Sequence, residues 1–262
     1  MPAISLNNAN FYYELHGQGA PLILIAGYTC DYSTWQLMLK ELAKHFQVLV
    51  FDNRGIGQTT DAHEPLSVRQ MAEDVMALAD HLHLEKPHIA GQSMGGTIAQ
   101  TVAAHFPDKI NKLCLLTTSA KWRQAMLRGL KSLLLMREKN IEFDLVFEST
   151  LPWIFGEAFL QSKEIVAGFK KLLLENPYPQ SLDDQTRQFH VLSNFDGREQ
   201  LNHIKAPTLI VHGTQDIISL PEESHHLAKN ISQATLVEFD CAHGITLEKP
   251  KELADALIHF LK

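Results

Sequence analysis

A serine between glycines is the first feature of this sequence that could do chemistry. Ser93 is at the centre of Gly91-Gln92-Ser93-Met94-Gly95, which follows an apolar stretch at 87–90 and precedes a helix-like stretch that ends at His105. Glycines on both sides permit the sharp turn that exposes a hydroxyl group. The amide of Met94 would open the helix and face negative charge that develops on a substrate oxygen. The segment therefore predicts a nucleophilic serine at a strand–turn–helix junction.

A serine nucleophile needs a base and an acid that orients the base. Ligands of open parallel sheets meet the loops that follow the strands, so these partners should come directly after strands. Asp216 follows the apolar run 208–213 and His243 follows the run that ends at Phe239. Folds that carry the serine on such a strand–turn–helix junction place the three residues in the chain order serine, aspartate, histidine, and this chain has that order. Asp240 is the alternative acid.

The segments around these residues alternate between strand-like and helix-like patterns. A β-hairpin is predicted at 3–15, and Ser67 is predicted to cap a helix with Gln70. Buried strands are expected at 21–25, 47–52, 87–90, 111–117, 208–213 and 235–239. Helices are expected at 34–45 with Ser33 as the cap, at 67–83, at 222–229 and from 252 onward. This alternation predicts an α/β fold in which helices flank a mostly parallel central sheet.

The pattern changes between residues 121 and 203. This segment has helix-like runs at 124–139 and 162–175 and lacks comparable buried strands. We therefore expect a core domain formed by residues 1–120 and 204–262, and a helical cap inserted at 121–203. Four aromatic residues of the cap are candidates for the substrate pocket, or else they seal the cap onto the core: Trp122, Trp153, Phe155 and Phe159.

Composition narrows the function classes. The 262 residues are 45% hydrophobic and carry 23 basic and 30 acidic side chains, for a net charge of -7. This balance argues against a nucleic-acid partner. No apolar run approaches the roughly 18 residues of a membrane span, and we expect neither a membrane partner nor a signal peptide. The scattered Cys30, Cys114 and Cys241 lack metal-type spacing, which favours a reduced, cytoplasmic protein. The chemistry of a serine nucleophile implies neither a metal nor another cofactor.

Together these motifs resemble the α/β-hydrolase superfamily, in particular its small, cap-bearing esterases and lactonases. The resemblance covers nearly the whole chain and rests on the segment 91–96, on Asp52-x-Arg54-Gly55-x-Gly57, on Gly213-x-x-Asp216, and on His243 with Glu248-Lys249-Pro250. It implies a catalytic triad of Ser93, Asp216 and His243. It also implies an oxyanion hole formed by the backbone amides of Tyr28 and Met94.

Two further expectations come from this resemblance. Many relatives carry a histidine where this chain has Ala26, so the shape of the oxyanion loop is left open. The motif from Asp52 to Gly57 is expected to be structural, with Arg54 bracing its loop rather than touching substrate.

The resulting prediction is a serine hydrolase that cleaves a small or medium carboxylic ester through an acyl-enzyme. A lactonase is the main alternative, because the segment from Asn176-Pro177-Tyr178-Pro179 to Asp196-Gly197-Arg198 looks like the cap of enol-lactone hydrolases. A cofactor-free haloperoxidase or perhydrolase would use the same triad. From a different class, the fold also supports non-catalytic ligand receptors.

A carrier-linked methyl ester is another alternative substrate. The run 121–139 has one acidic residue, Glu138, and six basic ones, namely Lys121, Arg123, Arg128, Lys131, Arg137 and Lys139. Such a basic helix could dock an acidic acyl carrier protein, as in the similar pimeloyl-carrier methyl esterases, or be an ordinary solvated helix face.

Overall fold

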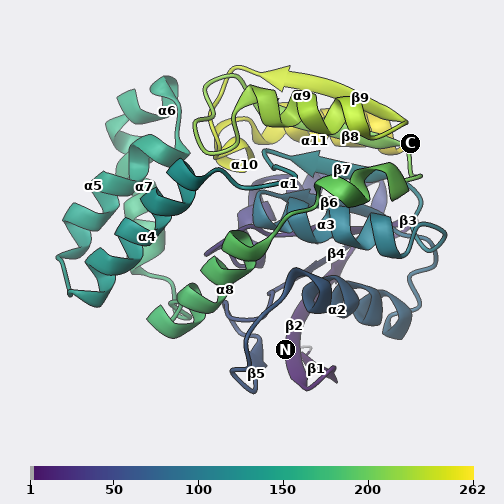
Figure 1. Cartoon of the computed structure of the whole chain (residues 1–262), viewed down its shortest axis with the longest axis horizontal. Coiled ribbons are helices and arrows are strands. Elements are labelled where there is room, and N and C mark those ends of the chain that lie inside the picture. Colours follow the sequence, from purple (N-terminus) through teal and green to yellow (C-terminus); the bar gives the residue numbers. More distant parts are fainter. Residues whose placement is uncertain (1–2) are drawn as a thin grey trace.

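The fold is built around one central β-sheet (Figure 1). The computed structural model describes residues 3–262. The strand order of the sheet is β1-β2-β4-β3-β6-β7-β8-β9, and β5 pairs with β2. The strands are β1 (Ala3–Leu6), β2 (Ala9–His16), β3 (Ala20–Ile25), β4 (Phe46–Phe51), β5 (Thr60–Asp61), β6 (His88–Gln92), β7 (Leu113–Leu116), β8 (Thr208–Gly213) and β9 (Ala234–Phe239). The six strands β4, β3, β6, β7, β8 and β9, which are neighbours in this order, pair in parallel. Strand β2 is antiparallel to β1, β4 and β5. The predicted α/β fold with a mostly parallel sheet is confirmed.

The helices separate into two sets. Those outside the segment 121–203 are α1 (Gln36–Leu42), α2 (Val68–His81), α3 (Met94–His105), α9 (Pro221–Asn230), α10 (Ile245–Glu248) and α11 (Pro250–Leu261), with a 3-10 turn η1 (Tyr32–Trp35). The others are α4 (Gln124–Glu138), α5 (Phe143–Ile154), α6 (Glu157–Gln161), α7 (Lys163–Leu174), α8 (Leu182–Asn194) and the 3-10 turn η2 (Arg198–His203).

The central strands are buried on both faces, which explains their continuous apolar runs. In β3, Ile23 and Ile25 belong to one core cluster together with residues of α2, α3 and α9. The alternate residues Leu22 and Leu24 belong to a second cluster, which α1 and α11 cover. Successive side chains of a strand point to opposite faces, so each helix layer packs on its own half of the strand residues.

The first predicted helix was wrong in its start and its cap. The chain forms the 3-10 turn η1 from Tyr32 to Trp35 before α1 begins at Gln36. Asp31 rather than Ser33 caps η1, and α1 itself has no side-chain cap. The carboxylate of Asp31 accepts a hydrogen bond from the amide of Ser33 at 2.9 Å. Both residue types are good caps, so the sequence did not distinguish them. By contrast, Ser67 caps α2 as predicted, with its hydroxyl accepting from the Gln70 amide at 3.1 Å.

The segment 121–203 leaves the sheet after β7 and returns before β8. Its helices α4 to α7 form the teal group on the left of Figure 1, and α8 runs back toward the sheet. This group has an apolar cluster of its own, made of Phe147, Leu151, Phe155 and Phe159. The division into a core and a cap remains a prediction. No helix within residues 3–262 is long and apolar enough to cross a membrane.

Candidate active site

Ser93 occupies the single residue between β6 and α3. Its backbone has φ of 56° and ψ of -118°, an unusual conformation for a residue with a side chain. Two glycines make the turn possible. A Cβ atom on Gly91 would lie 2.1 Å from the carbonyl oxygen of Gly95, and one on Gly95 would lie 2.0 Å from that of Ile25. The turn is therefore the strand–turn–helix junction that the sequence predicts, and its close packing excludes larger residues.

The structure brings the three predicted side chains together. The Nε2 atom of His243 lies 2.8 Å from Ser93 Oγ, and its Nδ1 atom lies 2.8 Å from Asp216 Oδ2. All three residues are buried. The second oxygen of Asp216 accepts hydrogen bonds from the amides of Ile218 and Ser219 at 2.8 and 3.0 Å. An ionised carboxylate only accepts, so Nδ1 carries the proton and Nε2 can accept from the serine hydroxyl.

Asp240, the alternative acid, does not contact His243. Its carboxylate is exposed and accepts a hydrogen bond from the Gln215 side chain at 2.7 Å. Asp216 is therefore the carboxylate that the histidine meets.

Hydrogen bonds from neighbouring loops fix the backbone on which the site is built. Gln92 and Thr117 donate to the carbonyl oxygen of His243 at 3.1 and 3.4 Å. Thr118 donates to the carbonyl oxygen of Ser93 at 2.7 Å. None of these three supports was predicted from the sequence. Their only signal is that polar residues directly follow or end buried strands.

The amides of Tyr28 and Met94, which the resemblance implies as the oxyanion hole, come from two segments that meet beside Ser93. Met94 opens α3, and Gly27 is so close to the serine that a Cβ atom on it would lie 3.2 Å from Ser93 Cβ. Within residues 3–262, neither the Tyr28 nor the Met94 amide donates a hydrogen bond to another protein group. Their role as an oxyanion hole stays a prediction.

The loop that carries Tyr28 has supports of its own, although Ala26 replaces a histidine. The Asn53 side chain donates to the carbonyl oxygen of Ala26 at 3.1 Å. On the other side, the amide of Thr29 donates to the side chain of Gln188 at 3.2 Å. Two contacts from distant segments thus hold the backbone on both sides of Tyr28.

The four aromatic candidates for the substrate pocket lie in two places. Trp122 is buried in the main core cluster, and Trp153 packs against it and over Gly129. Phe155 stacks on Phe159 with ring centres 3.7 Å apart. A Cβ atom on Gly244, beside His243, would lie 2.6 Å from the Phe155 ring. Phe155 thus packs against the residue that follows His243. The role of all four aromatic residues in a substrate pocket stays a prediction.

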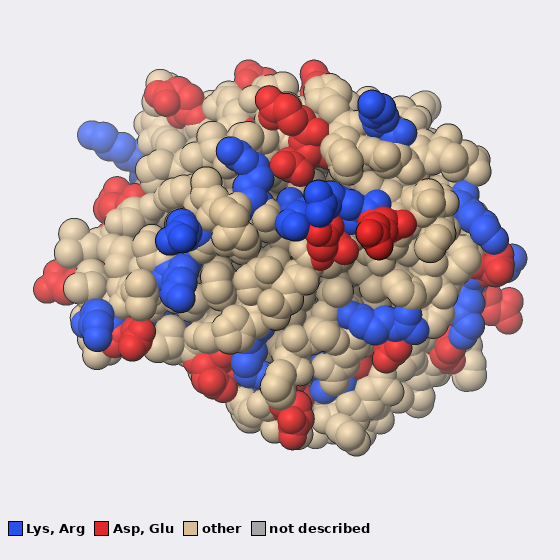
Figure 2. Space-filling view, viewed as in Figure 1, with Lys and Arg blue, Asp and Glu red and all other residues tan. Residues whose placement is uncertain are grey.

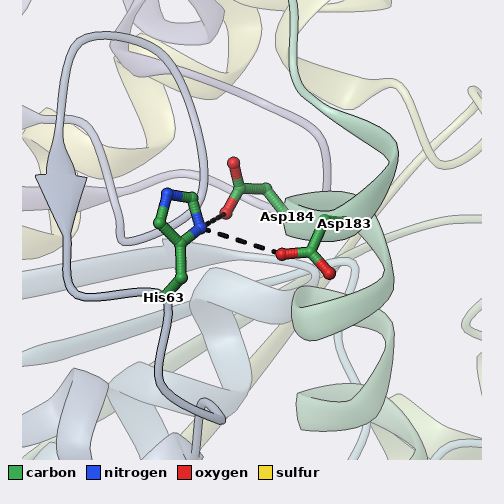
Figure 3. A group of neighbouring side chains, drawn as sticks. All are labelled: His63, Asp183 and Asp184. Carbon is green, nitrogen blue, oxygen red and sulfur yellow. Dashed lines mark ion pairs between the residues drawn. The ribbon is translucent and has the colours of Figure 1, made fainter.

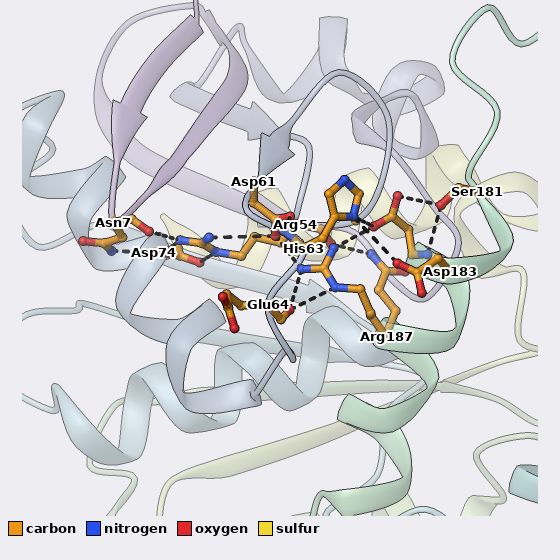
Figure 4. Close-up of polar contacts among 12 residues, drawn as sticks. Asn7, Arg54, Asp61, His63, Glu64, Asp74, Ser181, Asp183 and Arg187 are labelled. Carbon is orange, nitrogen blue, oxygen red and sulfur yellow. Dashed lines mark hydrogen bonds and ion pairs between the residues drawn. The ribbon is translucent and has the colours of Figure 1, made fainter.

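The motif from Asp52 to Gly57 forms a braced turn. The Arg54 side chain donates to the buried Asp74 carboxylate at 2.6 and 2.9 Å and to the carbonyl oxygen of Asn7 at 2.6 Å (Figure 4). Asp52 accepts from two backbone amides, while burial raises the pKa of Asp52 to about 6. Arg54 thus binds protein groups, in agreement with its expected structural role.

A further group of polar side chains lies where the β5 loop meets α8. The Nδ1 atom of His63 is 3.7 Å from an Asp183 oxygen and 3.5 Å from an Asp184 oxygen (Figure 3). His63 and Asp183 are exposed, so these ion pairs are weak surface contacts.

Comparison with known proteins identifies the family. The sequence profile described as alpha/beta hydrolase fold matches residues 20–250, and the chain belongs to this family. The 3-oxoadipate enol-lactonase 2 of Acinetobacter baylyi is 28% identical, with 99% of this chain and 94% of that protein covered. A carbamate hydrolase candidate, RutD, of Azorhizobium caulinodans is also 28% identical, with 99% and 98% covered. The enol-lactonase structure from Burkholderia xenovorans LB400 superposes with a TM-score of 0.88 at 23% identity, covering 99% of both chains.

Membership of this family confirms two expectations from the sequence. The fold is that of the α/β hydrolases, and the protein is an enzyme of the hydrolase class.

Proposed function

We propose that the protein hydrolyses carboxylic esters through a covalent acyl-enzyme on Ser93. The observation that carries this proposal is the continuous chain of contacts from Ser93 Oγ through His243 to Asp216, with both distances at 2.8 Å. His243 takes the hydroxyl proton as Ser93 attacks the carbonyl carbon, then gives that proton to the leaving alkoxide. Water, deprotonated by His243, attacks the acyl-enzyme and releases the acid and the free serine.

Backbone amides would stabilise the charge that develops on the carbonyl oxygen. The amides of Tyr28 and Met94 have no acceptor among residues 3–262, so binding an oxyanion there breaks no hydrogen bond within this range. Such preorganised donors are worth about 10²–10³ in rate each. Asp216 holds the imidazole in the productive tautomer and stabilises its charged form.

A lactone is the second candidate substrate. A lactone is an internal ester, so the same steps apply except that the leaving alkoxide stays attached to the acyl group. The relative named 3-oxoadipate enol-lactonase 2 matches this chain over nearly its full length, which supports a lactone of this type as the alternative.

The deciding experiment is a panel of p-nitrophenyl esters of increasing acyl length together with enol and saturated lactones. Ser93→Ala should lose about 10⁴-fold or more in kcat on every substrate that the wild type turns over. A rapid burst of p-nitrophenol equal to the enzyme concentration would show the acyl-enzyme. Substrate binding without a burst or turnover would favour the non-catalytic receptor alternative and defeat the proposal.

A carrier-linked ester has less support than either small substrate. Arg128, Lys131 and Lys139 of the basic run are exposed, but Lys121 pairs with Asp196 and Arg137 turns toward Gln185. Figure 2 shows basic and acidic side chains interspersed on this face, without a large area of one sign. If an acidic carrier docks through this run, kcat/KM for the carrier-linked ester should fall steeply as the salt concentration rises. For a small neutral ester, kcat/KM should not change with salt. The same response from both substrates would exclude such docking.

A further inference from the structure

Gln188 is a fully buried amide on α8 that links three separate segments. Its Oε1 atom accepts hydrogen bonds from the backbone amide of Thr29 at 3.2 Å and from the side chain of Gln180 at 3.0 Å. Its Nε2 atom donates to the carbonyl oxygen of Arg54 at 2.9 Å. One side chain thus connects the loop after β3, the loop after β4 and the segment that leads into α8.

The contact with Thr29 is next to the Tyr28 amide. Thr29 has φ of 61°, in the left-handed region that is unfavourable for a β-branched residue. Such a conformation persists only where surrounding contacts hold it. The peptide between Tyr28 and Thr29 is planar, so a hydrogen bond to the Thr29 amide fixes that whole plane. Only the two backbone torsions of Tyr28 then separate the fixed plane from the amide that faces the site.

The helix that carries Gln188 is firmly attached to the rest of the chain. The neighbouring Arg187 donates to Asp61 at 2.7 Å and to the carbonyl oxygen of Glu64 at 2.7 and 3.0 Å (Figure 4). It also donates to Asp184 at 2.6 Å. The side chains of Arg187 and Asp61 are each less than a tenth exposed, and charge-assisted hydrogen bonds between such side chains resist displacement. Gln188 is therefore held on a fixed element.

We propose that Gln188 is a positioning residue, which holds the Tyr28 amide in the orientation that binds the oxyanion. This inference rests on the proposed ester hydrolysis. Gln188 acts through the loop and touches neither Ser93 nor the substrate. Loss of its acceptor should release the Tyr28–Thr29 peptide and weaken binding of the transition state while leaving binding of the uncharged ester unchanged.

The test compares two buried glutamines with p-nitrophenyl acetate as substrate. Gln188→Met removes the acceptor at similar volume, and we expect kcat to fall about 10- to 100-fold with KM within about threefold of the wild type. Gln100→Met is the matched control, because Gln100 is equally buried and donates to the carbonyl oxygen of Ser119, away from the loop. Its kcat should stay within about threefold. Equal losses in both variants, or a kcat of Gln188→Met within twofold of the wild type, would overturn the proposal.

Gln188→Glu separates loop positioning from general packing. A glutamate keeps an acceptor for Thr29 but loses the donor to Arg54, so it should recover most of the kcat that Gln188→Met loses, despite a lower melting temperature. If Gln188→Met does not fold, Gln180→Met removes one partner of Gln188 from a half-buried position. It should lower kcat about two- to fivefold, and no change in kcat would count against the proposal.

Amide hydrogen exchange gives a readout that needs no catalysis. In a Ser93→Ala background, the Thr29 amide should exchange at least tenfold faster when Gln188 is methionine and unchanged when Gln100 is methionine. If the wild type lacks Ser93-dependent hydrolysis but Thr29 exchange responds, the proposed function fails and the Gln188 contact stands. If hydrolysis is Ser93-dependent but Thr29 exchange does not respond, the positioning role fails alone.

Discussion

The guanidinium of Arg187 on α8 donates a hydrogen bond to the Asp61 carboxylate of β5 at 2.7 Å, and both side chains are less than a tenth exposed. Burial by itself raises the pKa of Asp61, but the contact with Arg187 more than offsets it, so this pKa lies below its ordinary value. The two residues are far apart in the sequence, and their ion pair fastens α8 to the edge of the sheet.

Breaking this pair should cost more than breaking an exposed one. Arg187→Met leaves the buried Asp61 carboxylate without its nearest cation, for an expected loss of about 3 kcal/mol in the free energy of unfolding. Arg69→Met, which breaks the half-exposed pair with Glu73, should change it by about 0.5 kcal/mol or less. Urea denaturation measures both. Similar losses in the two variants would contradict a special role for the buried pair.

Substitutions of Asp216 and Asp240 should differ sharply in their effect on activity. Asp216→Asn replaces the carboxylate at His243 and favours the unproductive tautomer, so kcat should fall about 10⁴-fold. Asp240→Asn should leave kcat nearly unchanged, because Asp240 contacts Gln215 instead. Both are measured with the same p-nitrophenyl ester. A larger effect from Asp240→Asn would refute the assignment of the acid.

The pH dependence of hydrolysis should show a single acidic limb. His243 must be neutral to accept the serine proton, and a free histidine side chain becomes charged below about pH 6.5. We therefore expect kcat/KM to decline on acidification, as measured with a substrate that does not titrate. A profile that stays flat to about pH 4.5 would argue against a histidine base.

His88 should make stability fall at low pH. Burial, together with the nearby Lys112, lowers the pKa of His88 to about 4. The unfolded chain then binds more protons than the folded one between pH 6.5 and 4, so stability is complete above this window and falls with pH inside it. The loss from this residue amounts to about 3 kcal/mol at most.

Replacing His88 with a group that does not titrate should flatten this dependence. His88→Gln should reduce the change in unfolding free energy between pH 7 and 4.5, whereas His203→Gln, at an exposed position, should not. Denaturant titrations at the two pH values decide between these outcomes. If the unfolding free energy changes equally between pH 7 and 4.5 in the wild type and in His88→Gln, His88 does not cause the loss of stability at low pH.

The sheet and the three predicted site residues were predictable because their signals are local. Continuous apolar runs marked strands buried on both faces, and β8 was predicted with its exact bounds at 208–213. Ser93, Asp216 and His243 each occur directly after a strand, where an α/β sheet gathers its loops.

The supports of the site were not predictable, because they depend on contacts between distant residues. Gln188 meets Thr29 across 159 positions, and neither residue belongs to a motif. Gln92 meets His243 across 151 positions. Hydrogen bonds of single polar residues leave no periodicity, so only the folded chain reveals which buried glutamine meets which carbonyl or amide.

The segment 121–203 enters and leaves the sheet at neighbouring places. It connects β7 and β8, which are adjacent parallel strands, and the amide of Gly197 donates to the carbonyl oxygen of Ala120 at 2.7 Å. Lys121 and Asp196 form a β-bridge at the same place. The segment therefore begins and ends at neighbouring points of the sheet, although its helices extend far from those points. Helices between these points can therefore change in length without separating β7 from β8, provided that α8 keeps Gln188 beside Thr29.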